Sequence, residues 1–158
     1  MTYTTHIFVG AAIGSYMPNA WLAFIVGLIA HHLLDSIPHL DEGSYINIKA
    51  FQNRQLKPII IVATEVILGT IGLIYIAGLN ESVNWVNIFW GALGGTAADL
   101  ADNVPFWNRY LEKLPVFKQW FWLHDKLHGR LKKSQWLVGL LSQGILVALS
   151  VLILIIKK

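Results

Sequence analysis

The stretch PIIIVATEVILGTIGLIYIAGL, residues 58–79, decides the fold class, and its only charged side chain is Glu65. As an α-helix this segment is about 33 Å long, enough to cross the roughly 30 Å hydrocarbon layer of a bilayer. Pro58 suits the first turn of a helix, where its missing N–H would have no partner in any case. The stretch therefore predicts a membrane-spanning helix.

The rest of the chain repeats this pattern. Further apolar segments, each expected to form a helix, cover residues 3–17, 21–37, 84–104 and 136–156. Hydrophobic residues make up 55% of the 158-residue chain and charged residues 13%, about half the charged share of a soluble domain. We expect an all-α integral membrane bundle of about five apolar helices, the first one short, forming a single domain over residues 1–158.

The basic residues predict the orientation. Residues 106–133 mix seven Lys or Arg with Phe and Trp, which indicates an interfacial amphipathic helix near 115–128. The loop at 39–57 carries three more basic residues, whereas the turn at 80–84 carries none. By the positive-inside rule we expect a multi-pass protein of the inner membrane with a cytoplasmic N-terminus. The same rule explains the net charge of +3 without a nucleic-acid partner.

All six histidines fall at or near this predicted cytoplasmic face. At about 100° per residue, His31, His32 and Asp35 share an arc of one helix, and Asp99 and Asp102 share a face of another. The chain has no cysteine, so imidazole and carboxylate are the strong ligands on offer. The expected metal ligands are His6, His31, His32, Asp35, Asp99, Asp102 and His128.

These ligands predict one or two bound divalent metal ions. Zinc is favoured, and manganese or iron(II) also suits a mixture of imidazole and carboxylate. So many ligands exceed one tetrahedral zinc ion, so two bridged ions are an option. Asp35 and Asp102 are the candidate catalytic residues. The roles of His39, Asp41 and His124 stay open, and Glu65 is either a supporting base or a structural partner for a neighbouring helix.

Glycines indicate how the ligand-bearing helices approach one another. Gly10 and Gly14, and likewise Gly91 and Gly95, have the small-xxx-small spacing of closely packed helices. Residues 27–38 and 94–105 also align glycine, aspartate and proline without gaps. This faint repeat predicts two helices that each end in ligands followed by a proline.

The motifs at 5–42 resemble a known family. Thr5-His6-x3-Gly10-x3-Gly14, followed by a helix ending in His32-x2-Asp35-x2-Pro38, resembles the small prokaryotic membrane-bound metal-dependent hydrolases of the YdjM type. That family looks distantly similar to zinc-dependent phospholipase C. The resemblance implies an inner-membrane metallohydrolase.

Two functions follow as expectations. In the first, a metal-activated water attacks a phosphoester or related bond of a membrane lipid or another amphiphile at the cytoplasmic interface. In the second, the same residues form a non-catalytic site for metal sensing, metal transfer or structure. Local signatures of nucleotide, serine and HExxH hydrolases are absent from the sequence. The oligomeric state stays open.

Overall fold

A computed structural model describes residues 1–40, 53–129 and 131–157. These residues form seven α-helices and one short 3-10 helix, without a strand, so the all-helical prediction is confirmed. The elements are α1 (Tyr3–Ser15), α2 (Ala20–Asp35), α4 (Leu56–Gly78), α5 (Trp85–Asn103), α6 (Asn108–Leu111), α7 (Pro115–Leu127), η2 (Lys133–Gln135) and α8 (Trp136–Ile156).

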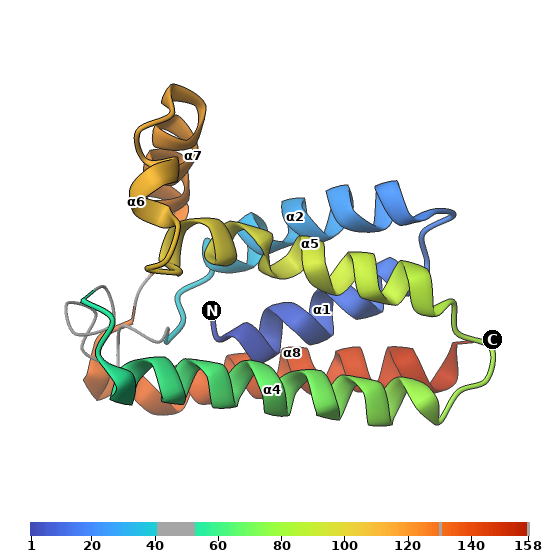
Figure 1. Ribbon diagram of the computed structural model, residues 1–158. Coiled ribbons are helices and arrows are strands. Elements are labelled where there is room, and N and C mark those ends of the chain that lie inside the picture. The colour runs from blue at the N-terminus through green and yellow to red at the C-terminus, as the bar shows by residue number, and fades with distance from the viewer. Residues whose placement is uncertain (41–52, 130, 158) are drawn as a thin grey trace.

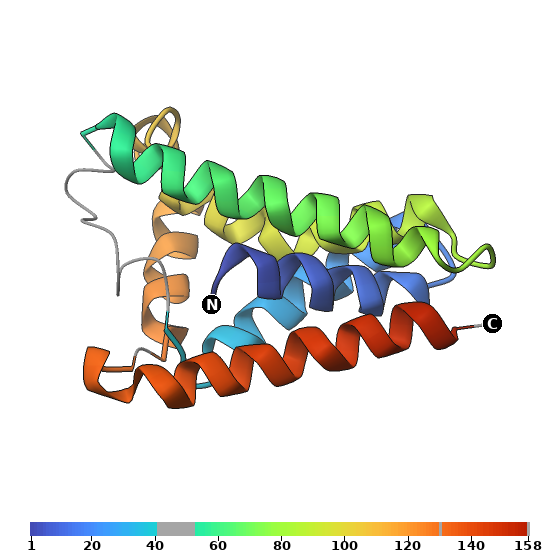
Figure 2. The same ribbon diagram turned by 90° about the horizontal axis from the view of Figure 1, so that it is seen from below.

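Five of these helices lie side by side as a bundle. Figures 1 and 2 show α1, α4 and α8 running in one direction and α2 and α5 in the other. Consequently the starts of α1, α4 and α8 meet the ends of α2 and α5 at one end of the bundle. The short α6 and the helix α7 lie at this same end, and α7 crosses the bundle axis in both views.

Helix α1 is the core of the bundle, with 10 of its 13 residues buried. It packs on α5 through glycines: a Cβ added at Gly10 would lie 2.4 Å from the carbonyl oxygen of Gly91, and one at Gly14 would lie 2.4 Å from that of Asn87. Helix α2 makes the same kind of approach, because a Cβ at Gly27 would lie 2.5 Å from the Gly91 oxygen. The predicted small-residue packing is confirmed.

The expectation of about five membrane-spanning helices is corrected. Only α4 and α8, among the described residues, are long and apolar enough to cross a membrane by length and composition. Helices α1 and α2 have 13 and 16 residues, so they reach about 20 and 24 Å. Helix α5 has 19 residues, but its glycines and the charged Asp99 and Asp102 lower its mean hydropathy. Helices α1, α2 and α5 instead bear His6, His31, Asp35 and Asp99 at one end of the bundle.

The helix boundaries follow local chemistry. The side chain of Asn19 accepts a hydrogen bond from the Leu22 amide at the start of α2, and Asn84 does the same for the Asn87 amide in α5. Pro115 occupies the first turn of α7, which confirms the helix predicted near 115–128. Residues 41–52 of the predicted loop at 39–57 lie outside the described residues.

Candidate metal centre

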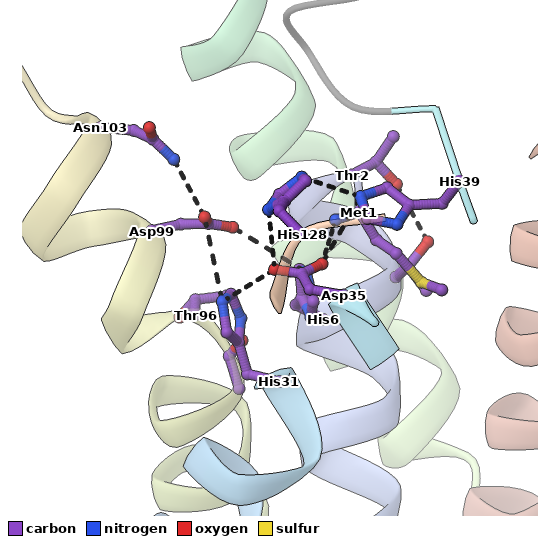
Figure 3. Close-up of polar contacts among 12 residues, drawn as sticks. Met1, Thr2, His6, His31, Asp35, His39, Thr96, Asp99, Asn103 and His128 are labelled. Atoms are coloured by element: carbon purple, nitrogen blue, oxygen red, sulfur yellow. Dashed lines mark hydrogen bonds and ion pairs between the residues drawn. The ribbon is translucent and has the colours of Figure 1, made fainter. Parts of the chain in front are cut away.

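Histidines and aspartates from separate segments converge where α1 begins and α2 and α5 end (Figure 3). Helix α1 contributes His6, α2 contributes His31 and Asp35, and α5 contributes Asp99. The remaining members follow α2, end α5, or lie in and just after α7: His39, Asp102, His124 and His128. Residues far apart in the sequence thus build one cluster, and its members at 6, 31, 35 and 39 have no exposed surface.

The first set of potential ligands comprises His31, Asp35, Asp99 and His124. Each residue offers one ligand atom, and these atoms all lie within 4.8 Å of one another. Asp35 Oδ2 lies 3.1 Å from His31 Nε2 and 3.3 Å from His124 Nε2. Asp99 Oδ1 lies 3.6 Å from His124 Nε2 and 4.0 Å from His31 Nε2. Two imidazoles and two carboxylates are a donor set that suits zinc, manganese or iron(II).

The hydrogen bonds of His31 and His124 at Nδ1 determine that the lone pair of each neutral ring is on Nε2, which faces the centre of the cluster. His31 Nδ1 donates to the Gly95 carbonyl oxygen at 2.8 Å, and His124 Nδ1 donates to Asp102 Oδ2 at 3.0 Å. When both rings are neutral, each Nε2 is therefore an acceptor, yet the two Nε2 atoms lie 3.2 Å apart. Only a proton or a metal ion between these atoms makes such an arrangement favourable.

A second set of potential ligands comprises Asp35, His39 and His128. His39 Nε2 lies 3.0 Å from His128 Nε2 and 3.6 Å from Asp35 Oδ1, and His128 Nδ1 lies 3.5 Å from Asp35 Oδ2. His39 Nδ1 donates to the Ile37 carbonyl oxygen at 2.7 Å, so its Nε2 again points inward as an acceptor. Asp35 belongs to both sets, so its carboxylate would contribute a ligand to each of two neighbouring metal ions.

Backbone pairing holds the second set in place. The amide of His39 donates to the Gly129 carbonyl oxygen at 2.9 Å, and the Leu131 amide donates to the His39 carbonyl oxygen at 2.9 Å. The Gly129 amide also donates to the Asp35 carbonyl oxygen, at 2.6 Å. A Cβ at Gly129 would lie 2.9 Å from the Ser36 oxygen, so glycine is needed for this approach. His128 is thereby held beside the end of α2.

Two polar side chains from the long apolar helices dock the start of α1. Gln143 of α8 accepts from the Thr2 amide at 2.9 Å and donates to the Leu40 carbonyl oxygen at 3.0 Å. Glu65 of α4 accepts from the Thr4 amide at 3.2 Å. These amides belong to the first turn of α1, where helical N–H groups have no partner within the helix. Between the two roles considered for Glu65, the structure shows a structural contact with a neighbouring helix.

His124 of the first ligand set and His39 of the second differ in their protonation. Burial disfavours the charged form of His124, but its hydrogen bonds to Asp102 and Asp35 outweigh burial and raise its pKa to about 9. Burial lowers the pKa of His39 to about 4, and the positive amino group of Met1 acts in the same direction. In the metal-free protein at neutral pH, His124 therefore holds the proton and His39 is neutral.

The remaining predicted ligands lie around these two sets. His6 Nε2 lies 3.2 Å from Asp35 Oδ1 and 3.9 Å from Asp99 Oδ2, which places it beside the carboxylate that belongs to both ligand sets. Asp102 contacts the outer nitrogen of His124, so it is placed to orient a ligand. His32 packs its ring on Trp120, with centroids 5.0 Å apart, and its two nitrogens are buried and have no hydrogen bond to any of the described residues.

Some residues of the centre carried a weaker signal in the sequence. His39 and His124 had open roles, although His124 and His128 have the i, i+4 spacing of paired ligands. His39 follows the proline that ends its helix, so no helical spacing connects it to Asp35. Gln143 had no sequence signal beyond being an amide in an apolar run, which is costly unless the amide is hydrogen-bonded.

Comparison with known proteins gives no further guidance. No family model, curated protein or solved structure matches this chain.

Proposed function

We propose that this protein is a membrane-embedded, metal-dependent hydrolase whose centre holds two divalent ions, zinc in preference to manganese or iron. The observation that carries the proposal is the position of Asp35 in both ligand sets. Paired divalent ions bridged by a carboxylate supply Lewis acidity and a water of lowered pKa for cleaving phosphoesters and related bonds. The resemblance to the YdjM type points to the same activity and is part of this proposal.

In such a centre some residues would bind the metal ions and others would orient these ligands. His31 and His124 would bind through Nε2, because Gly95 and Asp102 hold the proton on Nδ1 of each ring. Asp99 would add a carboxylate, itself fixed by a hydrogen bond of 2.9 Å from Asn103 Nδ2. These three contacts hold the ligands in place before a metal ion binds.

Asp102 is the best-placed group for moving protons between the centre and water. Its side chain is 25% exposed, whereas those of Asp35 and Asp99 are at most 3% exposed. It also faces the Nδ1 proton of His124. Asp102 would therefore hold this proton on His124 and exchange protons with solvent, whereas the buried Asp35 would contribute its carboxylate to both ligand sets.

The surface supports placement in a membrane. Most of α4 and α8 is exposed, and the exposed side chains are large and apolar, as at Leu68 (62%) and Leu140 (59%). Helix α2 also exposes Trp21 (77%) and Leu33 (65%). So large an apolar surface is unusual for a soluble monomer. In this proposal α4 and α8 span the bilayer, and α1, α2 and α5 lie beside them.

In this proposal the metal centre lies at the cytoplasmic interface of the inner membrane, because the basic segment at 106–133 is expected on the cytoplasmic side. The chain has no cysteine, so single cysteines introduced as Asn53→Cys and Asn80→Cys can be labelled in intact cells. An impermeant reagent added outside is expected to reach position 80 and not position 53. Labelling of position 53 and not position 80 would reverse the orientation.

The proposed substrate is an amphiphile whose phosphoester group reaches this interface. The test is to incubate the zinc-loaded protein in membranes with phospholipids and isoprenoid phosphates, beside Asp35→Ala and the distant carboxylate variant Glu81→Ala. We expect turnover by the unaltered protein and by Glu81→Ala, and loss of turnover in Asp35→Ala. No turnover across the panel, despite bound metal, would contradict hydrolysis.

A non-catalytic metal site is the second candidate, and burial favours it. The ligand residues at 31, 35, 39, 99 and 124 are at most 3% exposed, as in a structural site that admits no substrate. In that case the metal-loaded protein would bind its ions without turning over any member of the panel. The protein would then sense, transfer or be stabilised by the metal.

A further inference from the structure

Helix α7 has an apolar stripe that no described part of the protein covers. Val116 is 75% exposed, Leu123 41% and Leu127 39%. Spacings of seven and four residues place these side chains on one face of the helix. The adjacent face is already occupied, because Phe121 and His124 are buried against the end of the bundle. The stripe is therefore partly open to the surroundings of the protein, and most open at Val116.

The opposite side of α7 is charged. At about 100° per residue, Lys118 and Asp125 lie roughly half a turn away from the stripe. Lys126 lies between the two sides, about 80° from the stripe, with its ammonium 5.0 Å from the centroid of the Trp122 ring. Helix α7 thus has the composition of a helix that lies between hydrocarbon and water.

The whole α6–α7 arm is basic on its surface. The acidic residues with exposed side chains between 108 and 129 are Glu112 and Asp125. The basic residues of the same segment with exposed side chains are Arg109, Lys113, Lys118 and Lys126. This excess of positive charge complements a surface of anionic lipid head groups.

The position of α7 matches the plane of a membrane surface. It crosses the axis of α4 and α8 at the end of the bundle (Figures 1 and 2). Trp120 contacts the ring of His32 in α2, and the next residue of α2, Leu33, is 65% exposed. The side of α7 that bears Trp120 therefore lies against the end of α2.

We infer that α7 lies in the cytoplasmic leaflet, with the stripe of Val116, Leu123 and Leu127 among the acyl chains and the basic residues on anionic head groups. The inference rests on the membrane placement proposed above, but not on hydrolysis. A bilayer is the occupant that meets an apolar stripe and a basic surface at once. A second copy of the chain would bring two basic surfaces together.

Spin labels on single introduced cysteines test the inference on the full chain. The variants are Val116→Cys, Leu123→Cys and Leu127→Cys on the stripe, with Lys118→Cys and Asp125→Cys as matched positions on the opposite side. Each is placed in nanodiscs containing equal parts phosphatidylglycerol and phosphatidylcholine, or phosphatidylcholine alone. The accessibility of each label to oxygen is divided by its accessibility to a water-soluble nickel chelate. Ile71→Cys, at a position of α4 that is 57% exposed, reports contact with lipid.

In the anionic nanodiscs, we expect a several-fold higher ratio at the three stripe positions than at positions 118 and 125, and a smaller difference in neutral lipid. Equal ratios on the two sides would overturn the inference, as would spin–spin coupling between labels on two chains. An equal difference in both lipids would overturn the role of the anionic head groups. A low ratio at position 71 would overturn the membrane placement and this inference together, whereas the hydrolysis assay fails or succeeds independently.

Discussion

His31 Nε2 and His124 Nε2 face each other at 3.2 Å although α2 and α7 are far apart in the sequence. The Gly95 carbonyl and the Asp102 carboxylate hold the hydrogen on the opposite nitrogen of each ring. Two acceptor nitrogens are thereby directed at the carboxylate of Asp35. The arrangement is stable with a cation at its centre, and His124 supplies that charge as a proton in the metal-free protein.

The contact of Asp102 with His124 predicts different effects of removing each residue. His124→Ala removes a direct ligand, whereas Asp102→Ala removes the group that orients it, which we expect to weaken zinc binding by about 10–100-fold. Asp102→Asn should lose less affinity, because its amide oxygen still accepts from Nδ1. Competition with a zinc chelator measures all three. A loss in Asp102→Ala as large as in His124→Ala would make Asp102 a ligand, as the sequence predicted.

The raised pKa of His124 predicts the pH dependence of metal binding. Its pKa of about 9 in the metal-free protein means that below this pH a metal ion must displace the proton. Apparent zinc affinity should therefore rise between about pH 7 and pH 9 and then level off, with proton release on binding. Calorimetry in buffers of different ionisation enthalpy measures this release. An affinity that stays constant over this range would contradict the assignment of His124 as a ligand.

Gln143 should affect the second ligand set more than the first. Gln143→Leu removes the partner of the Thr2 amide and of the Leu40 carbonyl oxygen; both contacts are half-buried, so the cost is at the lower end of about 1–3 kcal/mol for each group. Gln143→Glu keeps the acceptor for Thr2 but loses the donor to Leu40, which follows His39. We expect both variants to weaken the second zinc ion in a titration, and Ser142→Ala, beside it on α8, to change neither ion. Equal weakening of both ions would rule out a selective role.

Glycine packing predicts a stability difference between two Gly→Ala variants. In Gly91→Ala the new methyl carbon would lie 2.3 Å from the Gly10 oxygen, so α1 and α5 must separate. Overpacking of this kind costs about 1–3 kcal/mol or more. Gly144→Ala meets nothing within 4 Å and should be stabilising by up to about 1 kcal/mol. Thermal unfolding in detergent compares them, and equal midpoints would contradict the close approach of α1 and α5.

Most of the fold could be predicted because its signals are local. Proline positions and apolar run lengths placed the five bundle helices within about two residues of their observed bounds, and the basic aromatic segment placed α7. The number of spanning helices was wrong, because an apolar segment buried inside a bundle has the same composition as one that faces lipid. Helix α1 is such a segment, since its burial comes from packing on Gly91 and Gly95 of α5.

The candidate site could be predicted in location but not in detail. Spacing along helices gathered His31 with Asp35, and Asp99 with Asp102, at one end of the molecule. Which atoms meet depends on contacts between segments: the Gly95 carbonyl directs His31 inward, and the pairing of residue 39 with residues 129 and 131 brings His39 to Asp35. No periodicity within one helix contains that information.

The elemental content of the purified protein tests the central claim most directly. The unaltered chain, Asp35→Ala and Glu81→Ala are purified without chelator, loaded with zinc, dialysed and analysed for metal per chain. Because Asp35 belongs to both ligand sets, the account predicts two tightly held ions in the unaltered protein and in Glu81→Ala, and loss of both in Asp35→Ala. The same metal content in all three proteins would contradict a metal centre built on Asp35.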